Sequence, residues 1–141
     1  MDNLTAEQRS KQMSLVRSRD TKPELLVRRA VHALGYRYRL HRTDLPGKPD
    51  LVFSSRKKVI FVHGCFWHGH KCKLGRMPKS SLEYWRNKIA TNKARDRRTL
   101  RRLRKLDWEC LTVWECSLHD ECWLAERIKR FLEPSPNLEE Q

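Results

Sequence analysis

Two short apolar runs separated by one long helical pattern most constrain how this chain can fold. Residues 59–62 read Val-Ile-Phe-Val and residues 110–114 read Cys-Leu-Thr-Val-Trp, rich in the β-branched and aromatic residues that favour strands. Apolar positions on one stripe predict a helix over residues 82–105 between them. A shorter strand is expected at residues 50–53. This order of elements predicts an α/β fold, a small mixed sheet with helices on both faces.

Local signals place the remaining elements. Thr21 and Glu24 have the spacing of a capping box that opens a second helix, and Gly35 is expected to end it. The other predicted elements are a helix over residues 5–17, a strand over 36–40, a loop over 63–81, a helix over 122–132 and a frayed, disordered tail over 134–141. Since the chain has no internal repeat or linker, residues 1–141 are expected to form one domain.

The charge of the chain indicates a polyanionic partner. It carries 31 Lys and Arg against 17 Asp and Glu, a formal charge of +14, and nucleic acid is the commonest partner for such an excess. No apolar stretch approaches the roughly 18 residues of a membrane span, and the N-terminus does not resemble a signal peptide. We therefore expect a cytoplasmic protein whose five cysteines are thiols or metal ligands.

Cysteine and histidine are concentrated in the loop HGCFWHGHKC, residues 63–72. Zinc prefers four thiolate or imidazole ligands, of which one or two often come from a distant segment. Cys116 is the best distant candidate, because it would meet this loop if residues 59–62 and 110–114 pair side by side; Cys110 and Cys122 are weaker. The candidates within the loop are Cys65, His68, His70 and Cys72. The spacing predicts a structural zinc site and leaves open which histidine binds.

Asp50 begins one predicted strand and His63 ends the next. Adjacent strands would place both at one edge of the sheet, where a carboxylate and a main-chain carbonyl can hold Mg²⁺ and an imidazole can activate water. By itself, Asp50 is explained more simply as a residue that caps the preceding turn.

Four segments, LPGKPDLVF, VIFVHGCFWHGHKC, YWRNKIATNKARDRR and LTVWEC, resemble the very-short-patch-repair (Vsr) endonucleases, in the same order from about residue 8 to 118. The resemblance implies a restriction-endonuclease-like mixed sheet flanked by helices, with a structural zinc site. It also implies a Mg²⁺-dependent enzyme that nicks DNA 5′ to the thymine of T·G mismatches formed by deamination of 5-methylcytosine.

Carried over residue by residue, the resemblance implies that Asp50 and the main-chain carbonyl of Val62 bind Mg²⁺. His68 would activate water, His63 would assist at the phosphate and Glu24 would lie near it. The implied zinc ligands are Cys65, His70, Cys72 and Cys116. Other roles stay open: Glu24 as a capping acid, His63 as a core histidine and His68 as a further zinc ligand.

Aromatic and basic residues would provide the DNA contacts. The resemblance implies that Phe66 and Trp67 enter the base stack with Trp85 nearby, although all three can also be core residues. Residues 86–105 include ten Lys and Arg, which favours phosphate contact. The candidates from this helix are Lys93, Arg95, Arg97, Arg98 and Arg101. Residues 1–20 are expected to contact DNA on the other side of the duplex.

The sequence therefore predicts a monomeric prokaryotic nicking endonuclease, nucleoid-associated when bound to DNA, with T·G-mismatched duplex as its partner and other mismatch-repair proteins as further candidates. Two alternatives remain: a zinc-stiffened DNA-binding module without catalysis, and a related nuclease with another target.

Overall fold

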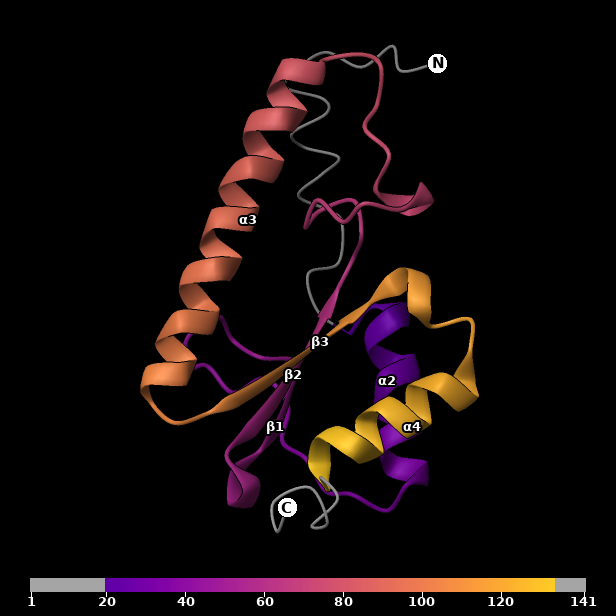
Figure 1. Cartoon of the computed structure of the whole chain (residues 1–141), viewed down its shortest axis with the longest axis vertical. Helices are drawn as coiled ribbons and strands as arrows, with labels where there is room; N and C mark the ends of the chain where they lie inside the picture. Colours follow the sequence, from indigo (N-terminus) through magenta and orange to yellow (C-terminus); the bar gives the residue numbers. More distant parts are fainter. Residues whose placement is uncertain (1–19, 134–141) are drawn as a thin grey trace, which may run out of the picture.

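A computed structural model describes residues 20–133 of the chain, so the helix expected at residues 5–17 and the tail at 134–141 lie outside the described part. The elements are α2 (Lys22–Ala33), β1 (Leu51–Phe53), β2 (Lys58–His63), α3 (Leu82–Lys105), β3 (Glu109–Trp114) and α4 (Glu121–Leu132), with short 3₁₀ turns at Ser54–Arg56, Lys73–Gly75 and Glu115–Ser117. Figure 1 shows their arrangement. No described helix is both long and apolar enough to cross a membrane.

The strands form one mixed sheet in the order β1-β2-β3. β1 runs antiparallel to β2, with Leu51 opposite Ile60. β2 runs parallel to β3, with His63 opposite Trp114. Because parallel strands require a long crossover, α3 fills the connection between β2 and β3, and the carboxyl ends of both strands meet at one edge. The predicted α/β class is confirmed.

Alternate residues of the strands face two separate cores. On one face, Ile60, Val62 and Val113 pack with Val31 of α2 and Ile128 of α4. On the other face, Val52, Val59 and Phe61 pack with Leu103 of α3. Figure 1 shows α2 and α4 side by side across the sheet from α3. The prediction of helices on both faces is therefore confirmed.

The start of α2 follows the predicted capping chemistry. Thr21 is the N-cap, with its side chain accepting from the Glu24 backbone N–H, and Pro23 lies in the first turn. The helix ends at Ala33, and Gly35 follows with φ +86°, a left-handed conformation that glycine adopts at little cost. This places the Glu24 side chain beside the sheet.

The strand expected at residues 36–40 is wrong. Only Arg39 pairs there, exchanging both backbone hydrogen bonds with Val52 at 2.9 and 3.0 Å. The alternation that suggested a strand has another cause, because Tyr36, Tyr38 and Leu40 pack against the α2/α4 core. The segment thus follows the outer edge of β1 as an isolated bridge.

The loop after β2 packs closely on α3, whose N-terminal half extends beyond the sheet (Figure 1). Gly69 has φ +65°, and a Cβ atom there would lie 2.6 Å from Ile89 Cγ2 and 2.7 Å from Lys93 Cδ. Only glycine allows this approach. The loop and α3 therefore form one surface.

Candidate active site and metal cluster

Parallel pairing of β2 and β3 assembles the Cys/His cluster, defined as Cys65, His70, Cys72 and Cys116. Cys65 follows β2 and Cys116 follows β3, so the sheet brings together two residues 51 positions apart. The ligand atoms of all four residues lie within 4.8 Å of one another. Cys110, at the opposite end of β3, and Cys122, at the start of α4, are not members.

The donor set of this cluster fits a metal ion. Cys116 Sγ lies 3.5 Å from His70 Nδ1, and the Cys116 N–H points at Cys65 Sγ at 3.4 Å. The Cys65 side chain is fully buried, and burial raises the pKa of its thiol to about 12. A cation is the natural group to displace such a proton, because it stabilises the buried thiolate. Three sulfurs and one imidazole match structural zinc sites.

An open cavity of about 850 Å³ lies next to this cluster at the carboxyl end of β2. It brings together the five residues for which the sequence implied catalytic or Mg²⁺-binding roles, namely Glu24, Asp50, Val62, His63 and His68. Arg95 and Asp96 of α3 and Arg28 of α2 also line it. Carboxylates, imidazoles and cations thus share one space large enough for a phosphodiester.

Asp50 is fixed at the floor of the cavity by two backbone contacts. Its N–H donates to the Ile60 carbonyl at 3.1 Å, and its Oδ2 accepts from the Val62 N–H at 2.6 Å. Burial raises the pKa of Asp50 to about 6, although the Val62 bond opposes this shift. A nearby cation would offset the cost of the buried charge, which suits a metal ligand.

Two histidines and one aspartate form a second group. The rings of His63 and His68 stack at 3.7 Å with an angle of 2°. His68 Nδ1 lies 2.6 Å from Asp96 Oδ2, and ligand atoms of the three residues lie within 4.8 Å of one another. His63 is buried, its Nδ1 has no hydrogen-bond partner among the described residues, and burial lowers its pKa to about 4.

Sequence reasoning missed Asp96 as a site residue. It is the single acid among residues 86–105, and that isolation within a basic helix was the available signal. An acid there is poorly explained by solvation or by phosphate contact. In the structure it orients the His68 ring, as carboxylates do for imidazoles in other active sites.

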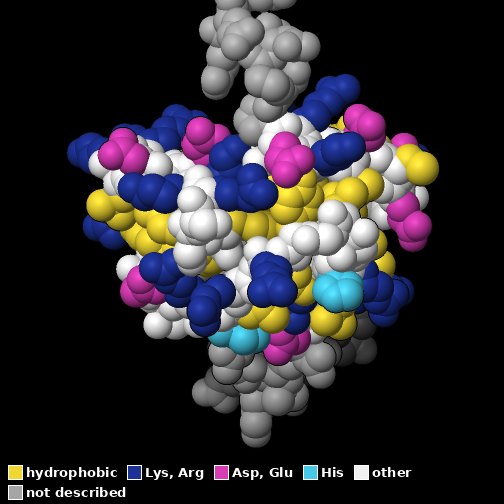
Figure 2. All heavy atoms as spheres, turned by 90° about the horizontal axis from the view of Figure 1, so that it is seen from below, with side chains coloured by type: hydrophobic (Ala, Val, Ile, Leu, Met, Phe, Trp, Pro, Cys, Tyr) yellow, Lys and Arg dark blue, Asp and Glu magenta, His cyan; other side chains and the backbone are white. Residues whose placement is uncertain are grey.

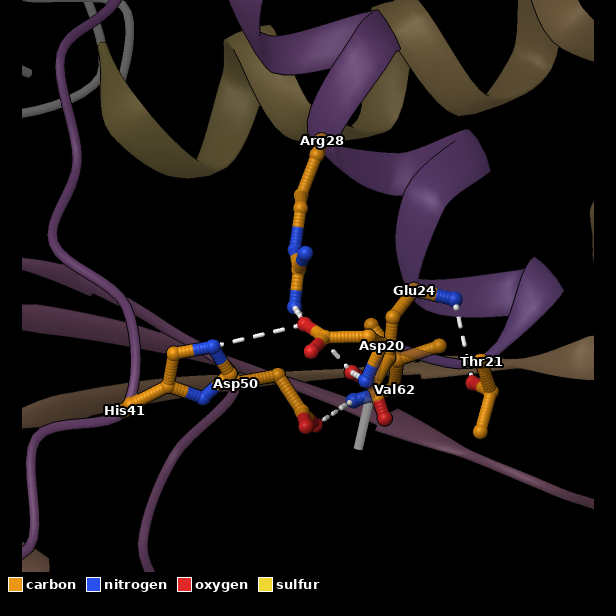
Figure 3. A network of polar contacts seen from close by, with 7 residues as sticks. All are labelled: Asp20, Thr21, Glu24, Arg28, His41, Asp50 and Val62. Carbon is orange, nitrogen blue, oxygen red and sulfur yellow. Dashed lines mark hydrogen bonds and ion pairs between the residues drawn. The ribbon is translucent and has the colours of Figure 1, made fainter. Parts of the chain in front are cut away.

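Glu24 lies on α2 and is 5% exposed. Its Oε2 accepts from the Asp20 N–H at 2.7 Å and from Arg28 Nη2 at 3.2 Å. Figure 3 shows these contacts together with Asp50 and Val62. The carboxylate therefore bonds to the residue before the N-cap, and Glu24 reaches the cavity while it stabilises the helix start.

An aromatic cluster, defined as Phe66, Trp67, Tyr84 and Trp85, joins the loop to the start of α3. Phe66 and Trp67 each contact the Trp85 ring, at 5.2 and 5.9 Å, and Tyr84 contacts it at 5.0 Å. Trp85 is 5% exposed, whereas Tyr84 is 53% exposed. Trp85 is thus the buried ring that the other three rings contact. Tyr84 is an exposed ring that the sequence analysis did not identify.

Asn92 of α3 binds the main chain of the loop that carries Phe66 and Trp67. Its Nδ2 donates to the Trp67 carbonyl at 2.9 Å, and the side chain is buried. The same helix presents the candidate phosphate contacts, all of them exposed: Lys93, Arg95, Arg97, Arg98 and Arg101. Figure 2 shows Lys and Arg side chains spread over the face seen there, with acidic residues between them, and exposed cations outside α3 include Arg29, Lys57 and Lys129. Positive charge therefore extends beyond α3.

Comparisons with known proteins agree with this arrangement. The family model described as DNA mismatch endonuclease Vsr matches residues 1–74. The type II nicking enzyme V.XorIIP of Xanthomonas oryzae pv. oryzae is 52% identical over 134 residues, covering 95% of this chain and 98% of that protein. V.NmeAIP, a type II nicking enzyme of Neisseria meningitidis, is 41% identical over 93% of this chain and 94% of its own length.

The DNA mismatch endonuclease Vsr of Escherichia coli is 41% identical over 130 residues, covering 88% of this chain and 83% of that protein. Two thirds or more of each of these relatives is matched at well above 30% identity. The resemblance seen in the sequence is thereby confirmed, and the chain belongs to the Vsr endonuclease family.

Proposed function

We propose that this protein is a Mg²⁺-dependent endonuclease that nicks DNA 5′ to the thymine of a T·G mismatch. The observation that carries the proposal is the convergence in one cavity of Asp50, Glu24, His63 and the His68–Asp96 pair, directly beside a loop bearing Phe66 and Trp67. A module that only binds DNA has no use for a buried acid next to an oriented imidazole. Membership of a nuclease family supports the same reading.

Two metals fit the side chains present. Asp50 and the Val62 carbonyl would hold Mg²⁺, which supplies charge stabilisation for the phosphate and lowers the pKa of bound water. Cys65, His70, Cys72 and Cys116 would hold Zn²⁺ as a structural ion, because four N and S donors leave no open position for chemistry.

His68 is the residue proposed to accept a proton from the attacking water. Asp96 bonds to Nδ1 at 2.6 Å, so Nε2 is left to face the cavity ligand. His63 stacks on His68 and stays neutral near pH 7, because its pKa lies near 4. It is proposed to assist at the phosphate as a hydrogen-bonding group.

Recognition is assigned to the aromatic cluster. Phe66 and Trp67 are partly exposed above the buried Trp85, and their loop is held by the Cys/His cluster and by Asn92. Apolar wedges of this kind enter base steps, most easily at a mismatch, where less stacking is lost. The basic residues of α3 would bind the flanking phosphates without reading sequence. We propose that the protein acts as a monomer on DNA in the cytoplasm, with mismatch-repair proteins as further partners.

The test compares end-labelled duplexes that differ only in carrying T·G or T·A at one position, with and without Mg²⁺. We expect Mg²⁺-dependent nicking 5′ to the thymine of the T·G duplex and none in the Asp50→Asn variant. Zinc content is measured on the same preparation, so that loss of the structural metal is not mistaken for loss of chemistry.

Other outcomes would favour the alternatives. Tight binding of T·G DNA without any nicking at saturating Mg²⁺ would indicate a DNA-binding module. Equal nicking of both duplexes, or nicking at another position, would indicate a nuclease with a different target.

A further inference from the structure

One half-buried arginine that lines the cavity, Arg28, binds the carboxylates of Asp20 and Glu24. The Arg28 side chain is 13% exposed, and Nη2 donates to Asp20 Oδ1 at 2.8 Å and to Glu24 Oε2 at 3.2 Å. Figure 3 shows it reaching from α2 toward Asp20, with His41 on the other side of that carboxylate; His41 Nε2 lies 3.3 Å from Asp20 Oδ1. The proposed reaction assigns no role to Arg28.

The geometry of Glu24 depends on this arginine. Both contacts to the Glu24 carboxylate among the described residues use Oε2, one from Arg28 and one from the Asp20 backbone. Two donors on one oxygen hold Oε2 in place and leave Oε1 for a group bound in the cavity, which Glu24 lines. Because Glu24 and Arg28 lie four positions apart on α2, the helix itself sets their spacing.

The charges that line the cavity also give Arg28 a part in the site. Glu24 and Asp50 are two carboxylates that line one cavity, and Arg28 lines it with them. Buried like charges are costly unless a partner of opposite sign compensates them. Arg28 also keeps a buried Nε that has no partner among the described residues. Such an unsatisfied donor is rare, and it is often found where a functional site has set the arrangement.

We propose that Arg28 is a positioning residue of the active site: its guanidinium orients the Glu24 carboxylate toward the cavity and compensates its charge beside Asp50. The inference rests on the proposed nicking activity. Lysine would replace it poorly, because an ammonium retains the charge but lacks the planar guanidinium whose Nη2 donates to both Glu24 and Asp20.

The test is a double-mutant cycle measured as single-turnover nicking of T·G duplex at saturating Mg²⁺ and protein. Arg28→Met should lower the rate by about 10- to 100-fold, the scale expected when a catalytic group is misplaced. The rate of Arg28→Lys should fall between those of Arg28→Met and the unmodified protein. Arg29→Met, which removes an exposed cation from the next position of the same helix, is the matched control and should leave the rate unchanged.

The second substitution of the double-mutant cycle is Glu24→Gln. If Arg28 acts through Glu24, adding Arg28→Met to Glu24→Gln should cause no further loss, whereas an independent structural role would give additive losses. A folded Arg28→Met variant as active as Arg29→Met, or an undiminished effect in the Glu24→Gln background, would overturn the inference. Should Arg28→Met not fold, the same cycle with Arg28→Lys decides. Absence of nicking by the unmodified protein would instead refute the proposed function.

Discussion

Two residues in the cavity are shifted by the same cause toward their uncharged forms. Burial raises the pKa of Asp50 to about 6 and lowers that of His63 to about 4, because each charged form loses solvent. Near pH 7, above both values, Asp50 is ionised and His63 is neutral. The cavity therefore assigns different protonation states to neighbouring side chains.

Removal of the Asp96 charge should impair chemistry more than binding. Asp96→Asn keeps the shape of the side chain but alters the hydrogen bond to His68 Nδ1 and the tautomer it selects. We expect single-turnover nicking to fall about 100-fold or more, with DNA affinity measured in Ca²⁺ unchanged within about threefold. Asp107→Asn, an exposed acid just beyond α3, is the control. An unchanged nicking rate for Asp96→Asn would show that the His68–Asp96 contact has no catalytic role.

Asp50 should lower the stability of the protein in the absence of Mg²⁺. Because its folded pKa is raised from 3.8 to about 6, the folded state holds the proton more tightly than the unfolded state. The resulting penalty is absent below about pH 4, grows as pH rises to 6 and is then constant, with an upper bound of about 3 kcal/mol. Asp50→Asn should therefore be more stable than the unmodified protein at pH 7.

Urea unfolding of both proteins from pH 4 to 8 in Mg²⁺-free buffer measures this difference. The two free energies of unfolding should converge at the acidic end. A difference that is independent of pH would mean that the Asp50 carboxyl is not the source.

Which site residues the sequence could predict depends on how their contacts arise. Asp50, His63 and Cys116 lie at strand ends, so strand pairing alone brings them to one edge. Asp96 meets His68 across 28 positions, and this contact depends on how α3 crosses the loop. No local pattern contains that crossing.

At the scale of elements, the loop after β2 is held from two directions. The Cys/His cluster fixes it to the end of β3, and Asn92 and the Gly69 approach fix it to α3. The helices and paired strands were predictable from capping and periodicity. The segment at residues 36–40 was not, because its alternating apolar residues serve core packing and only one of its residues pairs with β1.

Replacing Cys116 should release zinc, whereas replacing Cys122 should not. Cys116→Ser removes one of the four clustered donors, whereas Cys122 is exposed at the start of α4. We expect Cys116→Ser to lower the zinc content and the melting temperature, because metal binding contributes to folding. Elemental analysis and thermal unfolding check both variants. Full zinc occupancy in Cys116→Ser would assign the fourth ligand elsewhere.

Trp67 should matter for selection more than for cleavage. Base–aromatic stacking contributes roughly 1–3 kcal/mol per base, so Trp67→Ala should reduce the T·G over T·A preference by about one to two orders of magnitude. Zinc should stay bound, since Trp67 is not a donor. Trp123→Ala, which removes an exposed tryptophan of α4, is the control. A retained preference in zinc-loaded Trp67→Ala protein would make Trp67 a packing residue.

At the scale of the whole molecule, a charge of +14 favours binding to DNA of any base sequence. The exposed cations of α3 form its densest run, but basic side chains also occur on other faces (Figure 2). Net charge was readable from composition. Which cations contact phosphate was not, because that depends on the path of the duplex.

Replacing Arg97, Arg98 and Arg101 together with glutamine should weaken binding to matched and to mismatched DNA equally. The slope of log affinity against log salt should flatten by about 0.9 for each phosphate that is no longer neutralised by the protein. The matched control neutralises Arg127, Lys129 and Arg130, three exposed cations of α4, and should change the slope less. Weakened binding of mismatched DNA alone would assign base recognition to α3.

The anchoring of two adjacent loop residues on α3 has a consequence for where the DNA strand is cut. Trp67 is held at Asn92 and His68 at Asp96, positions one helical turn apart and about 6 Å along the axis. Successive nucleotides of one strand are spaced about 3.4 Å along the duplex. Because α3 is rigid, this spacing would confine the cut to within about two nucleotides of the base step that Trp67 enters, whatever the surrounding DNA sequence.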